Sequence, residues 1–419
     1  MSITIKPSSI SGNLVAPSSK SSMQRACAAA LLHLGSTTLY NAGSSNDDLA
    51  ALDVIQKLGA TVHYNTDKSL TIISKGVYPI SNNINFGESG LGIRMFAPIA
   101  ALSNASLELN GKGSLPTRPM NFFDEIFPLL GIQIQSNKGK LPLTIQGPLI
   151  PADITVDGSL SSQFITGLLM AYSAANAEAT ITVNNLTSKP YIDLTLDVMK
   201  DFGMNIPLNN NYESFSFLPS KIQSAGHIYY TVEGDWSSAS FLLVAAAISG
   251  KVTLNGLNAN SSQADKAIID ALILAGCKPL IDKNEVTISK TDLHAFEFDA
   301  TNCPDLFPPL VALAAYCKGT STIKGVNRLQ HKESNRGITL QEEFGKMGIA
   351  IQLQNDEMLI TGNDVIGATI NPHNDHRIAM ACAVAGLRAK GDTIIDNPHV
   401  VNKSYPGFFT DLQKLQDAE

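Results

Sequence analysis

A repeated helix ending constrains the fold of this chain more than any other feature. Five predicted helices end in a glycine that is followed by an alternating strand pattern. Glycine at a helix C-terminus adopts the left-handed cap without steric cost. The five glycines follow one another at intervals of 72 or 73 residues, and they are Gly59, Gly131, Gly203, Gly276 and Gly348. A period of this length predicts repeated α/β layers rather than the turns of a solenoid.

Other features share this period. A helix rich in small residues precedes a strand that ends near Asn or Gly, and these strands are STTLYN, ASLELNG, ATITVNN, KVTLNG, STIKG and DTIIDN. The helices before them are expected to begin near Ser21, Gly90, Ser161, Ser237, Asp305 and Asp375. These features predict six repeats of roughly seventy residues. Each repeat would consist of a strand followed by helix–strand–helix–strand–strand. The junction at 232–240 resembles the region around Lys20, so we predict a division into three plus three repeats.

Composition narrows the class of protein. With 419 residues, 44% of them hydrophobic, the chain is long enough for two domains with their own cores. A net charge of −7 gives no global basic field for nucleic acid. Five scattered cysteines without a C-x-x-C pair predict buried thiols in a reducing compartment. The N-terminus lacks a signal-peptide pattern and the longest apolar stretch is too short to span a bilayer, so we expect a cytoplasmic protein without membrane or nucleic-acid partners.

Arginine is rare and concentrated. The chain has 7 Arg against 23 Lys, and six Arg lie either in the first turn of a leading helix or just after a middle strand. These six are Arg25, Arg94, Arg118, Arg328, Arg336 and Arg377. A helix N-terminus already carries partial positive charge, so further cations there need a compensating partner. That partner is either an acidic side chain of a neighbouring repeat or a bound anion, and the shared repeat position favours the anion.

Serines and carboxylates occur at the same junctions. Serine hydroxyls open the helices near Lys20 and Ser161, where they serve either as helix caps or as anion ligands. Asp305 opens a helix in CPDLFPP, and Glu333 lies between Lys332 and Arg336 in HKESNR. The structural alternatives are an N-cap for Asp305 and a solvated loop charge for Glu333. Their place among the arginines favours a role in general acid–base catalysis.

The junction motifs, taken together, resemble those of the EPSP synthase family of enolpyruvyl transferases. In chain order they are SSKSSMQR, GESGLGIR, PTRPM, DGSLSSQF, SKPYID, EGDWSSAS, PDLFP, HKESNR, NDHRIAMA and NKSYPGFF. The resemblance implies an α/β fold of the α+β type, a two-domain inside-out α/β barrel of six βαβαββ repeats, three per domain. It places one domain at 20–229 and the other at 1–19 plus 230–419, with crossovers near 17–20 and 230–236.

The same resemblance implies a reaction. The enolpyruvyl group of phosphoenolpyruvate would pass to the 5-hydroxyl of shikimate 3-phosphate by addition–elimination in a closing interdomain cleft. No metal or organic cofactor is needed, and we expect a monomer. The residues that bind shikimate 3-phosphate would be Lys20, Ser21, Arg25, Ser161, Ser162, Gln163, Ser188, Asp305 and Lys332. Those that bind phosphoenolpyruvate would be Lys20, Gly90, Arg118, Gln163, Arg336, Arg377 and Lys403.

Three residues would be catalytic in this family. Asp305 would take the proton of the attacking hydroxyl, and Glu333 with Lys20 would handle the proton at the vinyl carbon. The chain departs from the family pattern at Glu88 and Leu91, where Asn and Thr are usual. These two positions bear on glyphosate sensitivity.

Two other functions remain as alternatives. The sister enzyme that acts on UDP-N-acetylglucosamine typically uses a cysteine in the loop at 110–120, which contains none here. A non-catalytic six-repeat ring such as a DNA clamp would need basic charge spread along a duplex, which the acidic balance disfavours.

Overall fold

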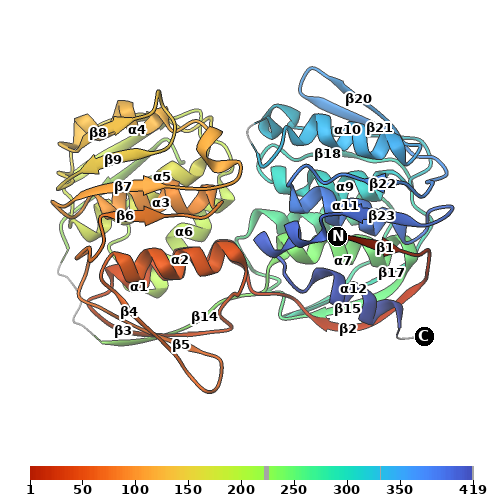
Figure 1. Cartoon of the computed structure of the whole chain (residues 1–419), viewed down its shortest axis with the longest axis horizontal. Helices are drawn as coiled ribbons and strands as arrows, with labels where there is room; N and C mark the ends of the chain where they lie inside the picture. Colours follow the sequence, from red (N-terminus) through yellow and green to blue (C-terminus); the bar gives the residue numbers. More distant parts are fainter. Residues whose placement is uncertain (221–225, 331, 418–419) are drawn as a thin grey trace. The chain divides into compact units, whose positions relative to one another are not determined.

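The computed structural model describes residues 1–220, 226–330 and 332–417. The chain divides into two compact units, which we number 1 and 2 (Figure 1). Unit 1 comprises Met1–Ser19 together with Glu233–Glu419, and unit 2 comprises Lys20–Val232. The fold is mixed α/β, as predicted.

Unit 2 contains three four-stranded sheets with one shared topology. In each sheet the first strand is parallel to the second, and an antiparallel hairpin completes the other side. The strand orders are β14-β3-β5-β4, β6-β7-β9-β8 and β10-β11-β13-β12. Their bounds are β3 (Gly35–Tyr40), β4 (Thr61–Tyr64), β5 (Leu70–Ser74), β6 (Asn83–Asn85), β7 (Ser106–Asn110), β8 (Gln133–Ser136), β9 (Leu143–Gln146), β10 (Ile154–Asp157), β11 (Ala179–Asn184), β12 (Leu208–Asn210), β13 (Ser214–Phe217) and β14 (His227–Thr231).

Unit 1 contains two sheets of this kind and a shorter third one. The orders are β16-β17-β15-β2, β18-β19-β21-β20 and β1-β23-β22. In the last sheet the N-terminal strand β1 pairs antiparallel with β23, so red and blue ribbons lie side by side in Figure 1. The bounds are β1 (Ser2–Ile5), β2 (Ile10–Val15), β15 (Gly250–Asn255), β16 (Leu280–Asp282), β17 (Glu285–Ser289), β18 (Glu297–Asp299), β19 (Thr320–Lys324), β20 (Ala350–Gln354), β21 (Glu357–Thr361), β22 (Thr369–Ile370) and β23 (Thr393–Asp396).

Two sheets take their first strand from a distant part of the chain. Strand β2 directly precedes the first helix of unit 2, yet it pairs with β15 of unit 1. Strand β14 directly precedes the first helix after the return to unit 1, yet it pairs with β3 of unit 2. Each repeat therefore still has its parallel strand pair, although the order of the chain alone does not reveal which strands form it.

The leading helix of each repeat is deeply buried. Every residue of α3, α7, α9 and α11 is buried, as expected for helices that are apolar on all sides and surrounded by protein. Within each unit the three leading helices pack against one another. They are α1 (Lys20–Leu32), α3 (Gly90–Ala100) and α5 (Ser162–Ala174) in unit 2, and α7 (Trp236–Ser249), α9 (Phe307–Ala314) and α11 (His376–Gly386) in unit 1. Their starts lie within two residues of the predicted ones.

The second helix of each repeat buries one face only. In α12, for example, Phe408, Leu412 and Leu415 are buried at helical spacing. These helices are α2 (Asn46–Lys57), α4 (Asn121–Ile126), α6 (Pro190–Asp201), α8 (Ile268–Leu274), α10 (Arg336–Lys346) and α12 (Phe408–Gln416). The 3₁₀ segments are η1 (Leu115–Thr117), η2 (Phe127–Leu130), η3 (Ala264–Ala267), η4 (Pro304–Leu306), η5 (Val326–Leu329) and η6 (Pro398–Lys403).

The five periodic glycines all cap helices, which confirms the prediction. Their φ angles lie between +64° and +110°, the left-handed region that glycine adopts most easily. At Gly59, the Ala60 N–H donates to the Ile55 carbonyl at 2.9 Å and the Gly59 N–H donates to the Gln56 carbonyl at 3.0 Å. The same pair of bonds recurs at all five positions and defines the Schellman motif.

All five cysteines are buried free thiols, as predicted. In the described part of the chain, no helix is both long and apolar enough to cross a membrane.

Candidate active site

Seven charged side chains of unit 1 form a network that we call the acid–base cluster. It combines three carboxylates with four cations, and consecutive members lie 2.8–3.2 Å apart. Its members come from η4, the loop before α10, and the starts or ends of α10, α11 and η6. They are Asp305, Lys332, Glu333, Arg336, Asp375, Arg377 and Lys403.

Arg336 lies at the centre of the acid–base cluster. Its Nε and Nη2 donate to Asp375 at 2.9 and 3.2 Å, its Nη1 donates to Asp305 at 2.9 Å, and its Nη2 also donates to Glu333 at 2.8 Å. The side chain is only 1% exposed. Burial alone would lower the pKa of Arg336, but the surrounding carboxylates raise it above its ordinary value. Arg336 therefore remains a fixed positive charge.

Asp305 is the carboxylate with most cations around it. Besides Arg336, it accepts from Lys332 Nζ at 3.2 Å and from Arg377 Nη2 at 3.2 Å. Burial acts to raise the pKa of Asp305, but Arg377, Lys332 and Arg336 outweigh it and hold the pKa well below its usual range. Asp305 is thus an ionised carboxylate whose basicity depends on how strongly these three cations remain directed at it.

Glu333 completes the acidic side of the cluster. Its Oε2 accepts from Arg336, and its Oε1 lies 3.2 Å from Lys403 Nζ. Glu333 and Lys403 are 11% and 7% exposed. Carboxylates therefore supply the negatively charged partner that the sequence analysis expected for Arg336 and Arg377. Any anion that binds here must compete with Asp305 and Glu333 for the same donors.

A second group lies in unit 2, at the starts of α3 and α5. Arg94 Nη1 donates to Gln163 Oε1 at 3.0 Å, and Arg118 Nη2 donates to Ser114 Oγ at 2.9 Å. A Cβ added to Gly90 would lie 2.8 Å from Arg118 Nη1 and 3.8 Å from Gln163 Oε1. Gly90 leaves the space that Arg118 occupies above the start of α3.

Arg25 is buried between α1 and α6. Its Nε donates to Thr195 Oγ1 at 2.9 Å, while Nη1 and Nη2 donate to the carbonyls of Ser21 at 2.9 Å and Tyr191 at 3.2 Å. Burial lowers the pKa of Arg25 to about 10, so the guanidinium remains protonated at neutral pH. The packing fixes a permanent positive charge in the second turn of α1.

The predicted serines and Lys20 also lie at helix starts of unit 2. Ser161 caps α5 by accepting from the Gln163 N–H at 3.3 Å. Ser162 is 2% exposed, and Ser188, at 4%, takes a left-handed φ of +57° just before α6. Lys20 is the first residue of α1 and its Nζ lies 2.9 Å from Asp47 Oδ2.

Sequence reasoning misses several partners of the predicted residues. It marks Asp375 only as a helix start, although the position of Asp375 before an arginine in NDHR is a signal for an N-cap that also pairs with cations. It groups Arg94 with the other arginines but does not assign it to the site. Asp47 and Thr195 give no signal, because each lies far along the chain from the cation that it contacts.

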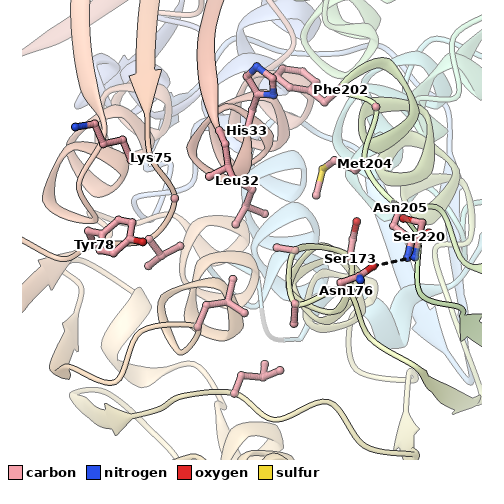
Figure 2. Close-up of a pocket in the computed structure, with 18 of the residues that line it drawn as sticks. Leu32, His33, Lys75, Tyr78, Ser173, Asn176, Phe202, Met204, Asn205 and Ser220 are labelled. Atoms are coloured by element: carbon pink, nitrogen blue, oxygen red, sulfur yellow. Dashed lines mark hydrogen bonds between the residues drawn. The ribbon is translucent and has the colours of Figure 1, made fainter. Parts of the chain in front are cut away.

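A separate hollow of about 990 Å³ lies in unit 2 (Figure 2). Leu32, the last residue of α1, and Ser173, near the end of α5, both line it. No predicted site residue is among the described residues that line this hollow. Helix C-termini carry partial negative charge, which disfavours phosphorylated ligands. The predicted residues instead gather at the opposite, N-terminal ends of these helices.

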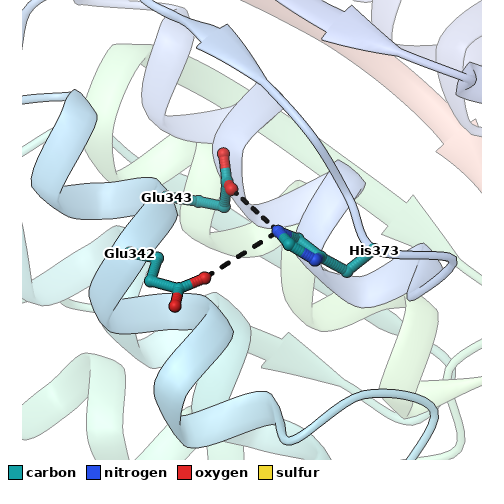
Figure 3. Close-up of side chains that lie close together, drawn as sticks. All are labelled: Glu342, Glu343 and His373. Carbon is teal, nitrogen blue, oxygen red and sulfur yellow. Dashed lines mark hydrogen bonds and ion pairs between the residues drawn. The ribbon is translucent and has the colours of Figure 1, made fainter.

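One group of side chains in the described residues has the make-up of a metal site. Potential ligand atoms of Glu342, Glu343 and His373 all lie within 4.8 Å of one another (Figure 3). Both oxygens of Glu343, however, already accept from Lys346 Nζ at 2.8 Å. An ammonium group therefore balances the buried carboxylate.

Comparisons with known proteins agree on one family. Residues 5–412 match the family model EPSP synthase (3-phosphoshikimate 1-carboxyvinyltransferase). A 3-phosphoshikimate 1-carboxyvinyltransferase of Methanocorpusculum labreanum is 36% identical over 99% of this chain and 98% of its own length. The enzyme of that name from Clostridium perfringens is also 36% identical, with the same coverage.

Solved structures extend the agreement to the fold. An EPSP synthase from Acinetobacter baumannii has a TM-score of 0.82 at 26% identity, covering 99% of this chain and 98% of its own. The enolpyruvyl transferase NikO from Streptomyces tendae has a TM-score of 0.79 over 99% of this chain and 97% of its own, and at 18% identity it supports the fold alone. The motifs, the family match and these relatives together show that the chain belongs to the EPSP synthase family.

Proposed function

We propose that this chain transfers the enolpyruvyl group of phosphoenolpyruvate to the 5-hydroxyl of shikimate 3-phosphate and releases phosphate. This is the reaction named by its family and its relatives, a step of the shikimate pathway toward aromatic amino acids. The observation that carries the proposal is the Asp305 carboxylate, which accepts from Lys332, Arg336 and Arg377 within 3.2 Å. A potential base is thereby surrounded by cations suited to phosphate and carboxylate groups.

Each substrate is assigned residues from both units. For shikimate 3-phosphate we propose Lys20, Ser21, Arg25, Ser161, Ser162, Gln163, Ser188, Asp305 and Lys332. For phosphoenolpyruvate we propose Lys20, Gly90, Arg118, Gln163, Arg336, Arg377 and Lys403. Each substrate brings several negative charges, and these would take over donors that now face carboxylates. Holding both substrates in fixed positions removes much of the entropic barrier to their reaction.

Substrate binding would also change the pKa of Asp305, the proposed base. While Lys332, Arg336 and Arg377 face Asp305, its pKa stays well below the usual value, although the side chain is only 24% exposed and partial burial acts to raise it. Substrate anions that share these cations would weaken their pull on Asp305, and its pKa would rise toward that of an effective base. Asp305 would then accept the proton of the 5-hydroxyl as the oxygen attacks the enol carbon. The carboxylate would become a base only once its substrates are in place.

The remaining protons are assigned to Glu333 and Lys20. The vinyl carbon gains a proton as the 5-oxygen adds to the neighbouring carbon, which gives a tetrahedral intermediate that still carries the phosphate. Loss of a proton from the new methyl group then expels inorganic phosphate and restores the double bond. Atoms and charge balance without a metal or an organic cofactor. Fixed donors on the departing phosphate lower the barrier to its release.

A phosphate-release assay tests the proposal. The wild-type chain should release phosphate only when both substrates are present, and not when UDP-N-acetylglucosamine replaces shikimate 3-phosphate. Asp305→Asn removes the base and should slow the reaction by about 10²–10⁴-fold. Asp299→Asn is the matched control, because Asp299 has a side chain that is 59% exposed. Equal activity of Asp305→Asn and wild type would remove Asp305 from the mechanism.

We also infer that the chain acts as a monomer in a reducing, cytoplasmic compartment. Both groups of cations come from a single chain, and five buried free thiols suit a reducing environment. Light scattering during size-exclusion chromatography tests the first point, with a mass near 44.6 kDa expected.

A further inference from the structure

Glu343 is a buried carboxylate for which the proposed reaction has no use. It lies on α10, and its side chain is 1% exposed. Lys346 Nζ donates to both of its oxygens at 2.8 Å, the Asn371 N–H donates to Oε2 at 3.1 Å, and His373 Nε2 lies 3.1 Å from Oε1 (Figure 3). A carboxylate offers about four acceptor positions, and these four contacts occupy them. No position is left for a metal ion.

Two of these contacts hold the loop that leads into α11. The loop begins directly after β22, and its His373 and Asn374 have φ angles of +49° and +58°. Left-handed conformations are uncommon outside glycine and persist where the surroundings impose them. Inside the loop, Asn371 Oδ1 accepts from the His373 N–H at 3.0 Å, and the Pro372 carbonyl accepts from the Asp375 N–H at 2.8 Å. Glu343 is an anchor for this loop from outside it.

The far end of the same loop is tied to the same helix. Asp375 closes the loop, caps α11 by accepting from the Arg377 N–H at 3.0 Å, and accepts two bonds from Arg336. Arg336 and Glu343 lie two turns apart on α10, and both are buried. The segment 371–375 is therefore clamped to α10 at its beginning and at its end.

We propose that Glu343 is a positioning residue for the acid–base cluster. By anchoring Asn371 and His373, it fixes the loop whose last residue is Asp375 and thereby sets where the Arg377 guanidinium is presented. The inference rests on the proposed function in one respect, namely that Arg336 and Arg377 bind phosphoenolpyruvate. Glu343 itself touches neither substrate in this proposal. Its effect is carried by the loop backbone.

Glu343→Gln tests the proposal with the smallest change of shape. The amide has one acceptor oxygen and two N–H donors, so it cannot accept from Lys346, Asn371 and His373 together. A misplaced Arg377 should raise the KM for phosphoenolpyruvate by about tenfold or more while kcat stays within about threefold. The affinity for shikimate 3-phosphate alone, measured by calorimetry, should be unchanged.

The neighbouring residue supplies a matched control. Glu342 lies on the same helix, approaches the same histidine at 3.9 Å and is 54% exposed. Glu342→Gln removes the same charge from the same region and should leave every parameter at the wild-type value. His373→Asn is a milder second variant, since Asn tolerates the left-handed conformation but is shorter. It should raise the same KM by a smaller factor.

Hydrogen exchange provides a readout that does not depend on the reaction. In Glu343→Gln the amides of the segment 371–375 should exchange faster than in wild type, whereas in Glu342→Gln they should not. Unchanged exchange and unchanged KM in Glu343→Gln would overturn the inference, as would equal losses for both substrates. An inactive wild type with accelerated exchange in Glu343→Gln would instead remove the proposed function and leave Glu343 as the loop anchor.

Discussion

Arg336 binds Asp375 through two nitrogens, with Nε 2.9 Å from Oδ2 and Nη2 3.2 Å from Oδ1, and the two side chains are 1% and 0% exposed. In this pair an arginine fork meets both carboxylate oxygens out of contact with water. Breaking a buried pair is far more damaging than breaking an exposed one, because the remaining charge cannot be solvated. Asp375 and Arg336 therefore support the fold as well as the proposed anion site.

Asp375→Ala should lower the free energy of unfolding by about 3–5 kcal/mol. Trp236 is the single tryptophan and is buried in α7 of the same unit, so its fluorescence during urea unfolding reports the change. Asp364→Ala is the control, because Asp364 and Lys390 lie 2.6 Å apart but are 74% and 67% exposed. That exposed pair should contribute less than about 1 kcal/mol. Equal losses in the two variants would show that burial does not decide the outcome.

Gly90→Ala should weaken phosphoenolpyruvate binding without unfolding unit 2. The added methyl carbon would lie 2.8 Å from Arg118 Nη1, so the guanidinium has to move. Hydrogen bonds to charged groups contribute about 1.5–3 kcal/mol, which corresponds to a rise in KM of about 10- to 140-fold. The KM for shikimate 3-phosphate is the internal control and should stay near the wild-type value. An equal rise in both constants would contradict the assignment of Arg118.

Alanine should change the stability of the protein in opposite directions at two neighbouring glycines, one inside α10 and one in its C-terminal cap. Gly345 lies within the helix, and beyond its chain neighbours and the surrounding helix backbone nothing lies within 4 Å of an added Cβ, so Gly345→Ala should stabilise the protein by about 0.5–1 kcal/mol. Gly348 has a φ of +80° and its nearest neighbours lie 3.6 Å away, so Gly348→Ala meets no clash but adopts a left-handed conformation. It should destabilise by about 1–2 kcal/mol. Urea unfolding monitored by Trp236 measures both, and changes of the same sign would contradict the cap assignment.

The features that the sequence predicts best are local ones. A Schellman cap depends on a glycine and the turn before it, so the five glycines can be identified from their period. The leading helices begin near their predicted starts because each start carries a local signal, a small or polar residue followed by a run rich in small and apolar residues. Local patterns do not predict the pairing of β2 with β15 or of β14 with β3, since these strands lie far apart in the chain. The family resemblance predicts only that 1–19 and 230–419 share a domain.

In the candidate active site, too, the sequence predicts contacts between residues that are close along the chain better than contacts between distant ones. Lys332, Glu333 and Arg336 are close in sequence, and a grouping of opposite charges within five residues is visible in the order of the amino acids alone. The partnership of Arg336 with Asp375 depends instead on how the loop after β22 meets α10. The assigned roles of all the site residues remain predictions, and their substrates supply the most direct tests.

Asp305 should make the stability of the substrate-free protein depend on pH in the acid range. In the free protein, burial raises the pKa of Asp305 but Arg377, Lys332 and Arg336 outweigh it, so the pKa lies well below the usual value. The unfolded chain, with an Asp pKa of about 3.9, then binds more protons than the folded one as the pH falls below that value. The stabilising contribution of Asp305 is therefore fully present above about pH 4 and is lost as the pH falls through the folded pKa.

Substrate binding should shift the acid limb of the activity to higher pH. Anions that share Lys332, Arg336 and Arg377 weaken the field at Asp305, so its pKa rises in the complex. The profile of kcat/KM reports the free protein and that of kcat reports the complex. We therefore expect an acid limb of kcat in phosphate-release assays from about pH 4 to pH 8, whereas kcat/KM should show no acid limb from Asp305 in that range. Coincident acid limbs would mean that the cations keep their hold on Asp305 after binding, and that another group accepts the hydroxyl proton.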